Sequence, residues 1–438
     1  MTFLKTNIIT IASKIICLAA SLFISIYIAR FLGPSAKGAY YLLIQTVSIL
    51  ATISLFGSDA AAIYYLGKRY SGRSVVIVSN FLIIALGIML TLALLLAHKT
   101  YFLKNVLITG GFGQLAIIAF AIPFMGVARL NSAILMGFNR FISFNILNIA
   151  LYVVMAINFI IFVIILRMDL FGALLSFMLA YLILSIVYII SILKSQRLRV
   201  EYKEPLENIS AAILLSYGWR AFLVPILLLV LYRVDSFFLN YYATIGAVGF
   251  YSVALSFAEL LLFIPESTGT ILLPKLVYSE PGDIDNRFIY ILRISIALTF
   301  ATAVLFLLTI RYVLPFVYGD VYLPSVQLTY ILLPGLVAMS TYYLFSSYFQ
   351  AIGRPGLVTG ILVIALTVKI VFCNIFIPKI SSSGAAIAST ISYLVCFMVF
   401  LTVFVIRSKF KLSEVFILKS SDVNFIKNSL NDIFDFQK

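Results

Sequence analysis

Long apolar stretches alternate with short polar ones along almost the whole chain. Glycine, proline and clusters of charged residues end each stretch, and a helix of about 20 apolar residues is long enough to cross the hydrocarbon core of a bilayer. Twelve stretches reach this length, so the pattern predicts twelve transmembrane helices. Their ranges are 8–31, 39–65, 75–97, 114–136, 144–166, 170–193, 213–241, 247–273, 288–310, 327–349, 356–377 and 384–406.

The pattern is also duplicated, because short segments with the same glycine and tyrosine spacing recur 211 or 212 residues later. AKGAYY (36–41) matches AVGFYS (247–252), and GALLSFMLAY (172–181) matches GAAIASTISY (384–393). The corresponding residues are Gly38 and Gly249, Tyr40 and Tyr251, Gly172 and Gly384, and Tyr181 and Tyr393. Six spans in each half return the chain to its starting side, so the repeats are parallel. We therefore predict an all-α polytopic membrane protein with two six-helix lobes around a central cavity.

Polar stretches set the boundaries of the predicted lobes. The N-lobe covers 1–193 and the C-lobe covers 211–406, while the most polar internal stretch, 194–210, forms a cytoplasmic linker. Residues 407–438 form a charged cytoplasmic tail, in which a short surface helix and a frayed chain are alternatives. The apolar residues at helical spacing in this tail are Ile426, Leu430, Ile433 and Phe434.

The composition agrees with a membrane protein. Only 11% of the 438 residues are charged and 63% are hydrophobic, whereas a soluble domain holds about 25% charged residues. Lipid must therefore solvate most of the chain. No polar stretch is long enough to form a basic soluble domain, which argues against a nucleic-acid partner.

The basic residues predict the orientation in the membrane. The net charge is +15, and with the N-terminus in the cytoplasm fifteen Lys and Arg residues fall on inner segments and six on outer ones. The positive-inside rule then puts both termini in the cytoplasm. This rule accounts for most of the basic excess, and an anionic substrate is the alternative. The six outer residues are Lys37, Lys99, Lys104, Arg167, Arg311 and Lys379.

Nine charged residues inside the predicted spans are candidate functional residues. Each costs about 2.5–3.5 kcal/mol at the centre of a bilayer, so such residues face a water-filled cavity or a partner charge. The basic ones are Lys14, Arg129, Arg220, Arg233 and Lys369, and the acidic ones are Asp59, Asp235, Glu259 and Glu266. Around a cavity, the basic residues would form an anion site, since a guanidinium can hold a phosphate through two parallel hydrogen bonds. Local pairing and snorkelling to the membrane surface are the alternatives, above all for Arg220 beside Trp219.

The acidic residues have two interpretations, binding of a coupling proton or cation and salt bridging to the arginines. Glu259 and Glu266 lie seven residues apart, which stacks them on one face of a regular helix. Pro265 predicts a kink in that span. Asp59 follows the sequence Phe-Gly-Ser, which predicts a break at the corresponding place in the second span.

Enzymatic and metal-binding patterns are missing from the sequence. The cysteines Cys17, Cys373 and Cys396 have unrelated spacings, the single histidine is His98 in an outer loop, and no phosphate-binding glycine loop or nucleophile elbow occurs. We therefore expect no enzyme, no metal and no cofactor. Tyrosine pairs near the span ends fit interfacial belts, with a minority available to stack on sugars. These pairs are Tyr40-Tyr41, Tyr64-Tyr65, Tyr241-Tyr242 and Tyr342-Tyr343.

Several segments resemble a known family. They are ARFLGPSAKGAYYLL (29–43), the stretch 231–276 that begins LYRVDSFFLNYYATIGAVGFYS, YFQAIGRPGLV (348–358) and IPKISSSGAAIASTISYLV (377–395). These segments are similar to the polysaccharide flippases of bacterial O-antigen, lipopolysaccharide and capsule pathways (Wzx-type). That family belongs to the superfamily of the multidrug extruders and the lipid II flippases.

The resemblance implies a function that the residue pattern alone does not give. It implies that undecaprenyl-pyrophosphate-linked oligosaccharides move from the cytoplasmic to the outer leaflet of the bacterial inner membrane by alternating access. The five basic residues would then hold the pyrophosphate, and the four acidic ones are candidates for coupling to a Na⁺ or H⁺ gradient. Expected partners are membrane lipids, a polysaccharide polymerase and a chain-length regulator. A multidrug cation antiporter and a membrane-embedded glycan polymerase remain alternatives.

Overall fold

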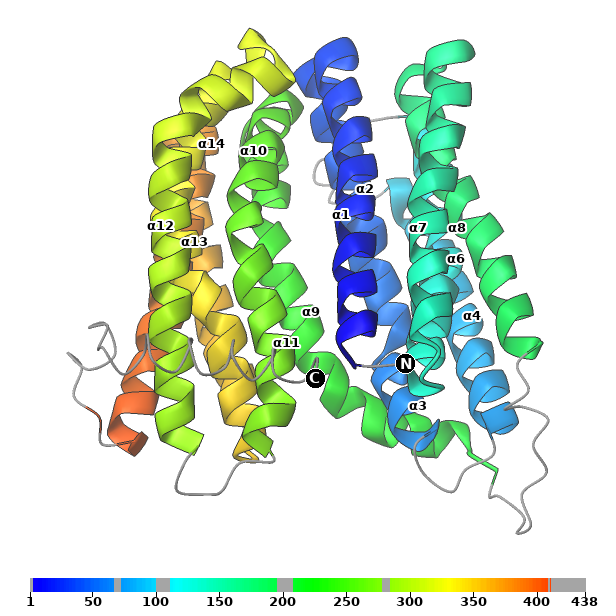
Figure 1. The fold of residues 1–438 in the computed structure, drawn as a ribbon. Coiled ribbons are helices and arrows are strands. Elements are labelled where there is room, and N and C mark those ends of the chain that lie inside the picture. The colour runs from blue at the N-terminus through cyan, green and yellow to red at the C-terminus, as the bar shows by residue number, and fades with distance from the viewer. Residues whose placement is uncertain are drawn as a thin grey trace. The chain divides into compact units, whose positions relative to one another are not determined.

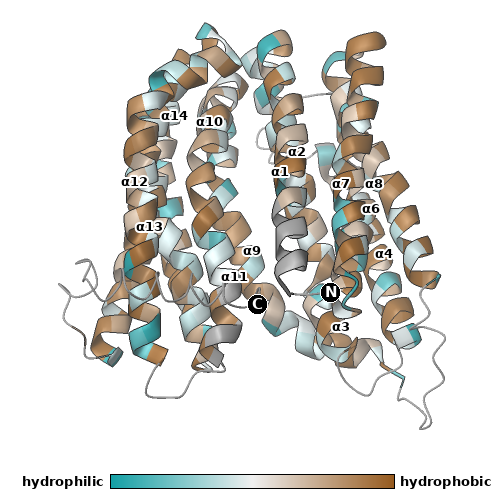
Figure 2. Ribbon diagram, in the orientation of Figure 1, coloured by the Kyte–Doolittle hydropathy of each residue, from teal (hydrophilic) through white to brown (hydrophobic). Residues whose placement is uncertain are grey.

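A computed structural model describes residues 3–66, 72–99, 111–194, 208–277, 284–408 and 410. In these ranges the regular structure is helical and no strand occurs, as expected where lipid cannot hydrogen-bond to the backbone and each span must satisfy its own amide groups. Hydrophobic residues predominate along the helical segments that are long enough to cross a membrane (Figure 2). The predicted tail helix and most of the predicted linker lie outside the described residues.

The first six spans follow the predicted order (Figure 1). They are α1 (Phe3–Tyr27) with the π-turn η1 (Ile28–Leu32), α2 (Gly33–Leu55) with α3 (Ser58–Leu66), α4 (Gly72–Leu96) with η2 (Ala97–Lys99), α6 (Phe112–Gly137), α7 (Phe141–Phe159) with η3 (Ile160–Ile165), and α8 (Asp169–Leu193).

The last six spans also follow the predicted order. They are α9 (Ala211–Tyr242), α10 (Ile245–Ala258) with η5 (Glu259–Leu262) and α11 (Phe263–Val277), α12 (Ile284–Tyr318), η6 (Asp320–Tyr322) with α13 (Leu323–Ala351), and the two parts of α14 (Pro355–Ser408). The two parts of α14 meet at a kink at Ile380 and Ser381.

The helices confirm the predicted fold class. Ten helical segments of the described chain are long and apolar enough to cross a membrane. Two of them contain two spans each: Ala12–Leu55 turns at Gly33, and Pro355–Ser408 turns at the kink in α14. All twelve predicted spans are therefore present.

The second span of each half is broken, as the sequence predicts. Phe56 and Gly57 have φ angles of 44° and 74° between α2 and α3, a left-handed backbone that glycine adopts without cost. In the other half, the 3₁₀ segment η5 lies between α10 and α11. Because 3₁₀ turns hold fewer residues than α turns, the register between Glu259 and Glu266 differs from that of a regular helix. Glu259 is half-buried and Glu266 is exposed.

The chain forms two compact units, Met1–Gly249 and Phe250–Lys438. In the first unit, α6 is the central helix and packs against α2, α3, α4 and α8. In the second unit, α13 packs against α11, α12 and α14. Helix α9, which the pattern assigns to the C-lobe, packs in the first unit against α2, α3 and α4. The predicted lobe boundaries stay a prediction.

The repeated glycines allow helices to approach closely. A Cβ atom on Gly38 of α2 would overlap the carbonyl oxygen of Ile245, and one on Gly249 of α10 would overlap that of Pro34, so these two corresponding glycines lie at one contact. Gly172 and Gly384 each lie against a backbone carbonyl of the preceding span, at Phe162 and Phe376 respectively. The repeated glycines thus serve the scaffold.

A reciprocal amide pair joins α4 to α6 in the first unit. Asn80 Nδ2 donates to Asn131 Oδ1 at 3.1 Å, and Asn131 Nδ2 donates to Asn80 Oδ1 at 2.9 Å. Asn131 is fully buried. Thr91 of α4 adds a hydrogen bond of 2.8 Å to the carbonyl of Ala119 in α6. Hydrogen bonds between membrane helices stabilise their packing.

We predict that Asn131→Leu lowers the stability of the protein, because Asn80 loses its buried partner. The expected loss is about 0.6–1.7 kcal/mol. The Asn80→Leu/Asn131→Leu double variant should lose less than the sum of the single losses, since both changes remove one interaction. Thermal unfolding in detergent measures this, with Asn374→Leu at an exposed site as the control. If the stability losses of the two single variants add up to the loss of the double variant, the amide pair does not stabilise the protein as proposed.

Candidate functional site

Arg129 of α6 lies in a polar cluster inside the first unit. Its Nη1 atom donates to Thr52 Oγ1 at 2.9 Å and to the carbonyl oxygen of Ser48 at 3.5 Å, both in α2. Tyr152 of α7 and Tyr181 of α8 lie within electrostatic range of this guanidinium. Its two hydrogen-bond partners are a hydroxyl and a carbonyl oxygen, so the half-buried guanidinium can attract an anion.

Lys369 of α14 lies in a second cluster, inside the second unit. Its Nζ atom is 3.4 Å from Tyr393 Oη and 5.0 Å from the centre of the Tyr393 ring. The hydroxyl of Tyr251 lies 3.0 Å from that of Ser389, one helical turn before Tyr393. Lys369, Tyr251, Ser389 and Tyr393 each have 0% exposure. Solvent does not reach this cation in the present conformation.

The two clusters are built on the repeated tyrosines. Tyr181 and Tyr393 correspond in the repeat. Tyr181 lies within electrostatic range of Arg129, and Tyr393 accepts a hydrogen bond from Lys369. The cations themselves come from different spans, the fourth and the eleventh. The repeated tyrosines therefore belong to the polar interior as well as to the scaffold.

Arg233 of α9 contacts α2. Its Nη1 atom donates to Tyr41 Oη at 3.0 Å, and its guanidinium lies 5.9 Å from the centre of the same ring. Asp235, two residues on, is fully buried and accepts a hydrogen bond from the Ser236 amide at 2.8 Å. Residues two apart lie on different faces of a helix, and these contacts of Arg233 and Asp235 are with different groups.

The remaining predicted residues are more accessible. Lys14 of α1, Arg220 of α9 and Glu266 of α11 are exposed, and Asp59 in the first turn of α3 is half-buried. The Arg220 guanidinium lies 5.6 Å from the centre of the Trp219 ring. The nine predicted residues thus range from fully buried to exposed, and Arg129, Arg233 and Lys369 each have different partners.

The sequence candidates do not include Lys37, which the structure shows to be a buried cation. The expected outer-loop residue has only 4% exposure, and its Nζ atom is 2.6 Å from Ser25 Oγ of α1. The reason is that α2 begins at Gly33, six residues before the predicted start of the span at 39. Pro34 in the first turn is the signal that could have placed this start, because proline favours the first helical position.

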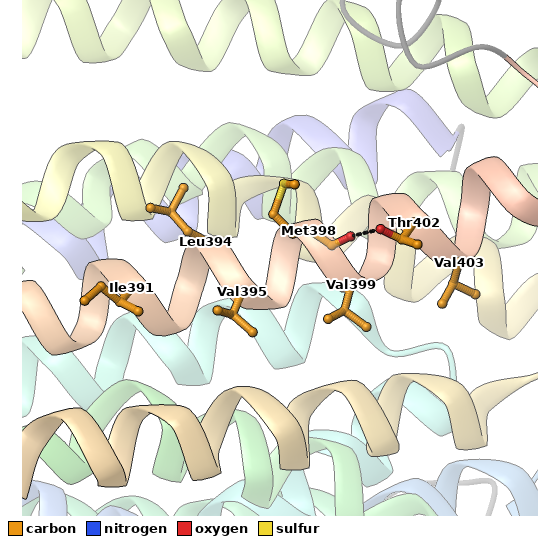
Figure 3. Close-up of a pocket in the computed structure, with 7 residues that line it drawn as sticks. All are labelled: Ile391, Leu394, Val395, Met398, Val399, Thr402 and Val403. Atoms are coloured by element: carbon orange, nitrogen blue, oxygen red, sulfur yellow. Dashed lines mark hydrogen bonds between the residues drawn. The ribbon is translucent and has the colours of Figure 1, made fainter.

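A shallow apolar groove runs along the last part of α14, with a volume of about 390 Å³. Its one hydroxyl, that of Thr402, donates to the Met398 carbonyl at 2.8 Å (Figure 3). The groove therefore suits hydrocarbon and not an anion. Its lining residues are Ile391, Leu394, Val395, Met398, Val399, Thr402 and Val403.

A model of the family described as "Polysaccharide biosynthesis protein" matches residues 3–280. The chain belongs to this polysaccharide biosynthesis family. The match covers more than half of the sequence and confirms the family resemblance. No curated protein sequence matches the chain.

Solved structures of the MOP superfamily share the fold. The lipid II flippase MurJ, in an inward closed conformation, has a TM-score of 0.73 at 18% identity over 94% of this chain and 89% of its own. An inward-facing multidrug resistance MATE transporter has a TM-score of 0.72 at 16% identity over 91% of this chain and 94% of its own.

A MOP transporter from Pyrococcus furiosus, described as having a binding pocket of reverse polarity, has a TM-score of 0.64 at 16% identity over 92% of this chain and 96% of its own. This polysaccharide biosynthesis family member is thus a multi-pass membrane protein with a transporter fold. Among its described residues, no group of three or more His, Cys, Asp or Glu side chains is placed to hold a metal ion.

We predict that Lys369→Met leaves the stability unchanged or raises it, because methionine keeps the length of the side chain and removes a desolvated charge. Tyr393→Phe should instead cost about 1–3 kcal/mol, since the buried ammonium loses a hydrogen-bond acceptor. The Lys369→Met/Tyr393→Phe double variant should recover that loss. Thermal unfolding in detergent measures all three, and equal losses in the two single variants would contradict this pairing.

Proposed function

We propose that the protein is a flippase that moves undecaprenyl-pyrophosphate-linked oligosaccharide repeat units from the cytoplasmic to the outer leaflet of the bacterial plasma membrane. The product would serve the synthesis of a surface polysaccharide such as O-antigen or capsule. The observation that carries the proposal is Arg129, a cation inside the first half of a chain that belongs to a polysaccharide biosynthesis family. MurJ, a lipid II flippase, shares the fold.

The physical problem for such a protein is the pyrophosphate. A bare ionised group costs tens of kcal/mol to place in hydrocarbon, so it must cross in contact with cations and hydrogen-bond donors. Arg129 supplies a planar fork that suits two phosphate oxygens. Lys14 and Arg220 are exposed and would attract the pyrophosphate first. Lys369 would become accessible as the protein alternates between inward-open and outward-open states.

Coupling and topology complete the proposal. Asp59, Asp235, Glu259 and Glu266 remain candidates for coupling to a Na⁺ or H⁺ gradient, because acids inside a membrane protein bind such ions or pair with cations. Both termini would face the cytoplasm under the positive-inside rule. A polysaccharide polymerase and a chain-length regulator are the partners that the family resemblance implies.

A multidrug cation antiporter is the alternative that the fold allows, since a MATE transporter shares it. The contacts of Arg129 favour the flippase, because a guanidinium surrounded by hydroxyls and carbonyl oxygens repels a cationic drug. A glycan polymerase is the other alternative. Loss of a flippase would leave unpolymerised repeat units on the inner leaflet, whereas loss of a polymerase would leave them on the outer leaflet.

We predict that Arg129→Gln/Lys369→Met lowers glycan export roughly tenfold or more in a cell that depends on this protein, because each change removes a charge-assisted contact to phosphate. Single repeat units should accumulate on the inner leaflet, which leaflet-selective labelling of the lipid-linked sugars measures. Arg311→Gln, at an exposed arginine of α12, is the matched control and should export normally.

Three results would contradict this proposal. Unchanged export in the double variant would exclude the two cations as the pyrophosphate site. Accumulation on the outer leaflet would indicate a polymerase. Altered drug susceptibility with normal glycan export, after removal of the protein, would indicate an antiporter.

A further inference from the structure

Three tyrosines from two helices form a stacked cluster in the first unit. The rings of Tyr64 in α3 and Tyr217 in α9 stack at 4.6 Å with an interplanar angle of 17°. Tyr65 stands edge-on to both, at 5.1 Å from Tyr64 and 5.8 Å from Tyr217. The cluster therefore lies where the end of α3 meets the first part of α9 (Figure 1).

The backbone next to the cluster packs closely between the α2–α3 turn and α9. A Cβ on Gly57 would overlap the carbonyl oxygen of Gly218, so the chain between α2 and α3 packs directly on α9. Phe56 stacks on Phe222 at 5.2 Å on the same contact. These contacts fix the two helices against each other and give the tyrosine rings a rigid support.

The cluster is open to its surroundings and lies beside a cation. Tyr64 is 39% exposed and Trp219 is 45% exposed. Arg220 is also exposed and lies three residues after Tyr217, on the same face of α9. Aromatic side chains and an exposed guanidinium thus lie together where α3 meets α9. The basic residues that follow α3 in the sequence belong to a segment that the positive-inside rule places in the cytoplasm.

The corresponding positions of the repeat do not hold the same residues. At the repeat offset of 211, Tyr64 and Tyr65 correspond to Lys275 and Leu276, while Tyr217 and Arg220 correspond to Thr6 and Ile9. The close-packed glycines of the scaffold recur at the repeat offset, whereas these tyrosines and this arginine do not. The cluster is therefore not part of the duplicated scaffold.

We propose that Tyr64, Tyr65 and Tyr217 form a platform on which a sugar ring of the lipid-linked substrate stacks, with Arg220 beside the phosphate that joins sugar to lipid. This proposal rests on the proposed function and adds the part of the substrate that the platform recognises. A pyranose presents a face of C–H groups that packs against an aromatic face, and a guanidinium holds phosphate oxygens through paired hydrogen bonds. The platform binds the substrate on the cytoplasmic side, before translocation.

The chain contains its own reporter for a test, because Trp219 is the only tryptophan. The full-length protein in lipid nanodiscs is titrated with farnesyl diphosphate and with farnesyl diphosphate that carries N-acetylglucosamine, and Trp219 fluorescence and calorimetry both give the dissociation constants. The glycosylated probe should bind about fivefold more tightly, the size expected for one aromatic contact. Tyr64→Ala and Tyr217→Ala should abolish this difference and leave the binding of farnesyl diphosphate unchanged.

The control is Tyr241→Ala, at the other end of α9. Tyr241 and Tyr242 form a comparable exposed pair with ring centres 4.8 Å apart, and the sugar-dependent difference should survive this change. Tyr64→Phe, which keeps the ring and the packing, should also retain it. Equal affinities of the wild-type protein for the two probes would overturn the platform and leave the flippase proposal standing. Failure to bind either probe would overturn both.

Discussion

Lipid offers no hydrogen bonds to the polar groups of the membrane-spanning segments, and the rest of the structure depends on that constraint. It makes each span helical, and several interior cations contact hydroxyl groups or aromatic rings of other spans. Arg129 contacts Thr52, Lys369 contacts Tyr393 and Lys37 contacts Ser25. A charge kept at such cost, with hydroxyls around it, is well suited to bind an anion that itself has to leave water.

Duplication has supplied a common frame with different chemistry in its two halves. Gly38 and Gly249 meet at one close contact, and Tyr181 and Tyr393 each lie near a cation. The cations come from different helices: Arg129 corresponds to Ser340, and Lys369 to Asn158. The residues of the tyrosine cluster of α3 and α9 are also not repeated at the offset of 211. Features required for packing are therefore repeated, and features that would recognise a substrate are not.

The sequence predicts the spans and their breaks well, because apolar length and the residues at Gly57 and Pro265 act locally. It places Lys37 wrongly, since a six-residue error in one helix start moves a buried cation into a loop. The sequence also does not distinguish tyrosines of an interfacial belt from tyrosines that contact another helix. Tyr41, which accepts a hydrogen bond from Arg233, and Tyr64, which stacks on Tyr217, are of the second kind. Those contacts join helices far apart in the chain, and periodicity within one helix carries no information about them.

The most direct test of the account is translocation by the purified protein in vesicles. A polyprenyl diphosphate carrying a fluorescent sugar is placed in both leaflets, and a membrane-impermeant quencher measures how quickly the inner pool reaches the outside. Wild-type protein should speed this exchange over that in protein-free vesicles, and Arg129→Gln should slow it roughly tenfold or more. Exchange no faster than in protein-free vesicles would contradict the account.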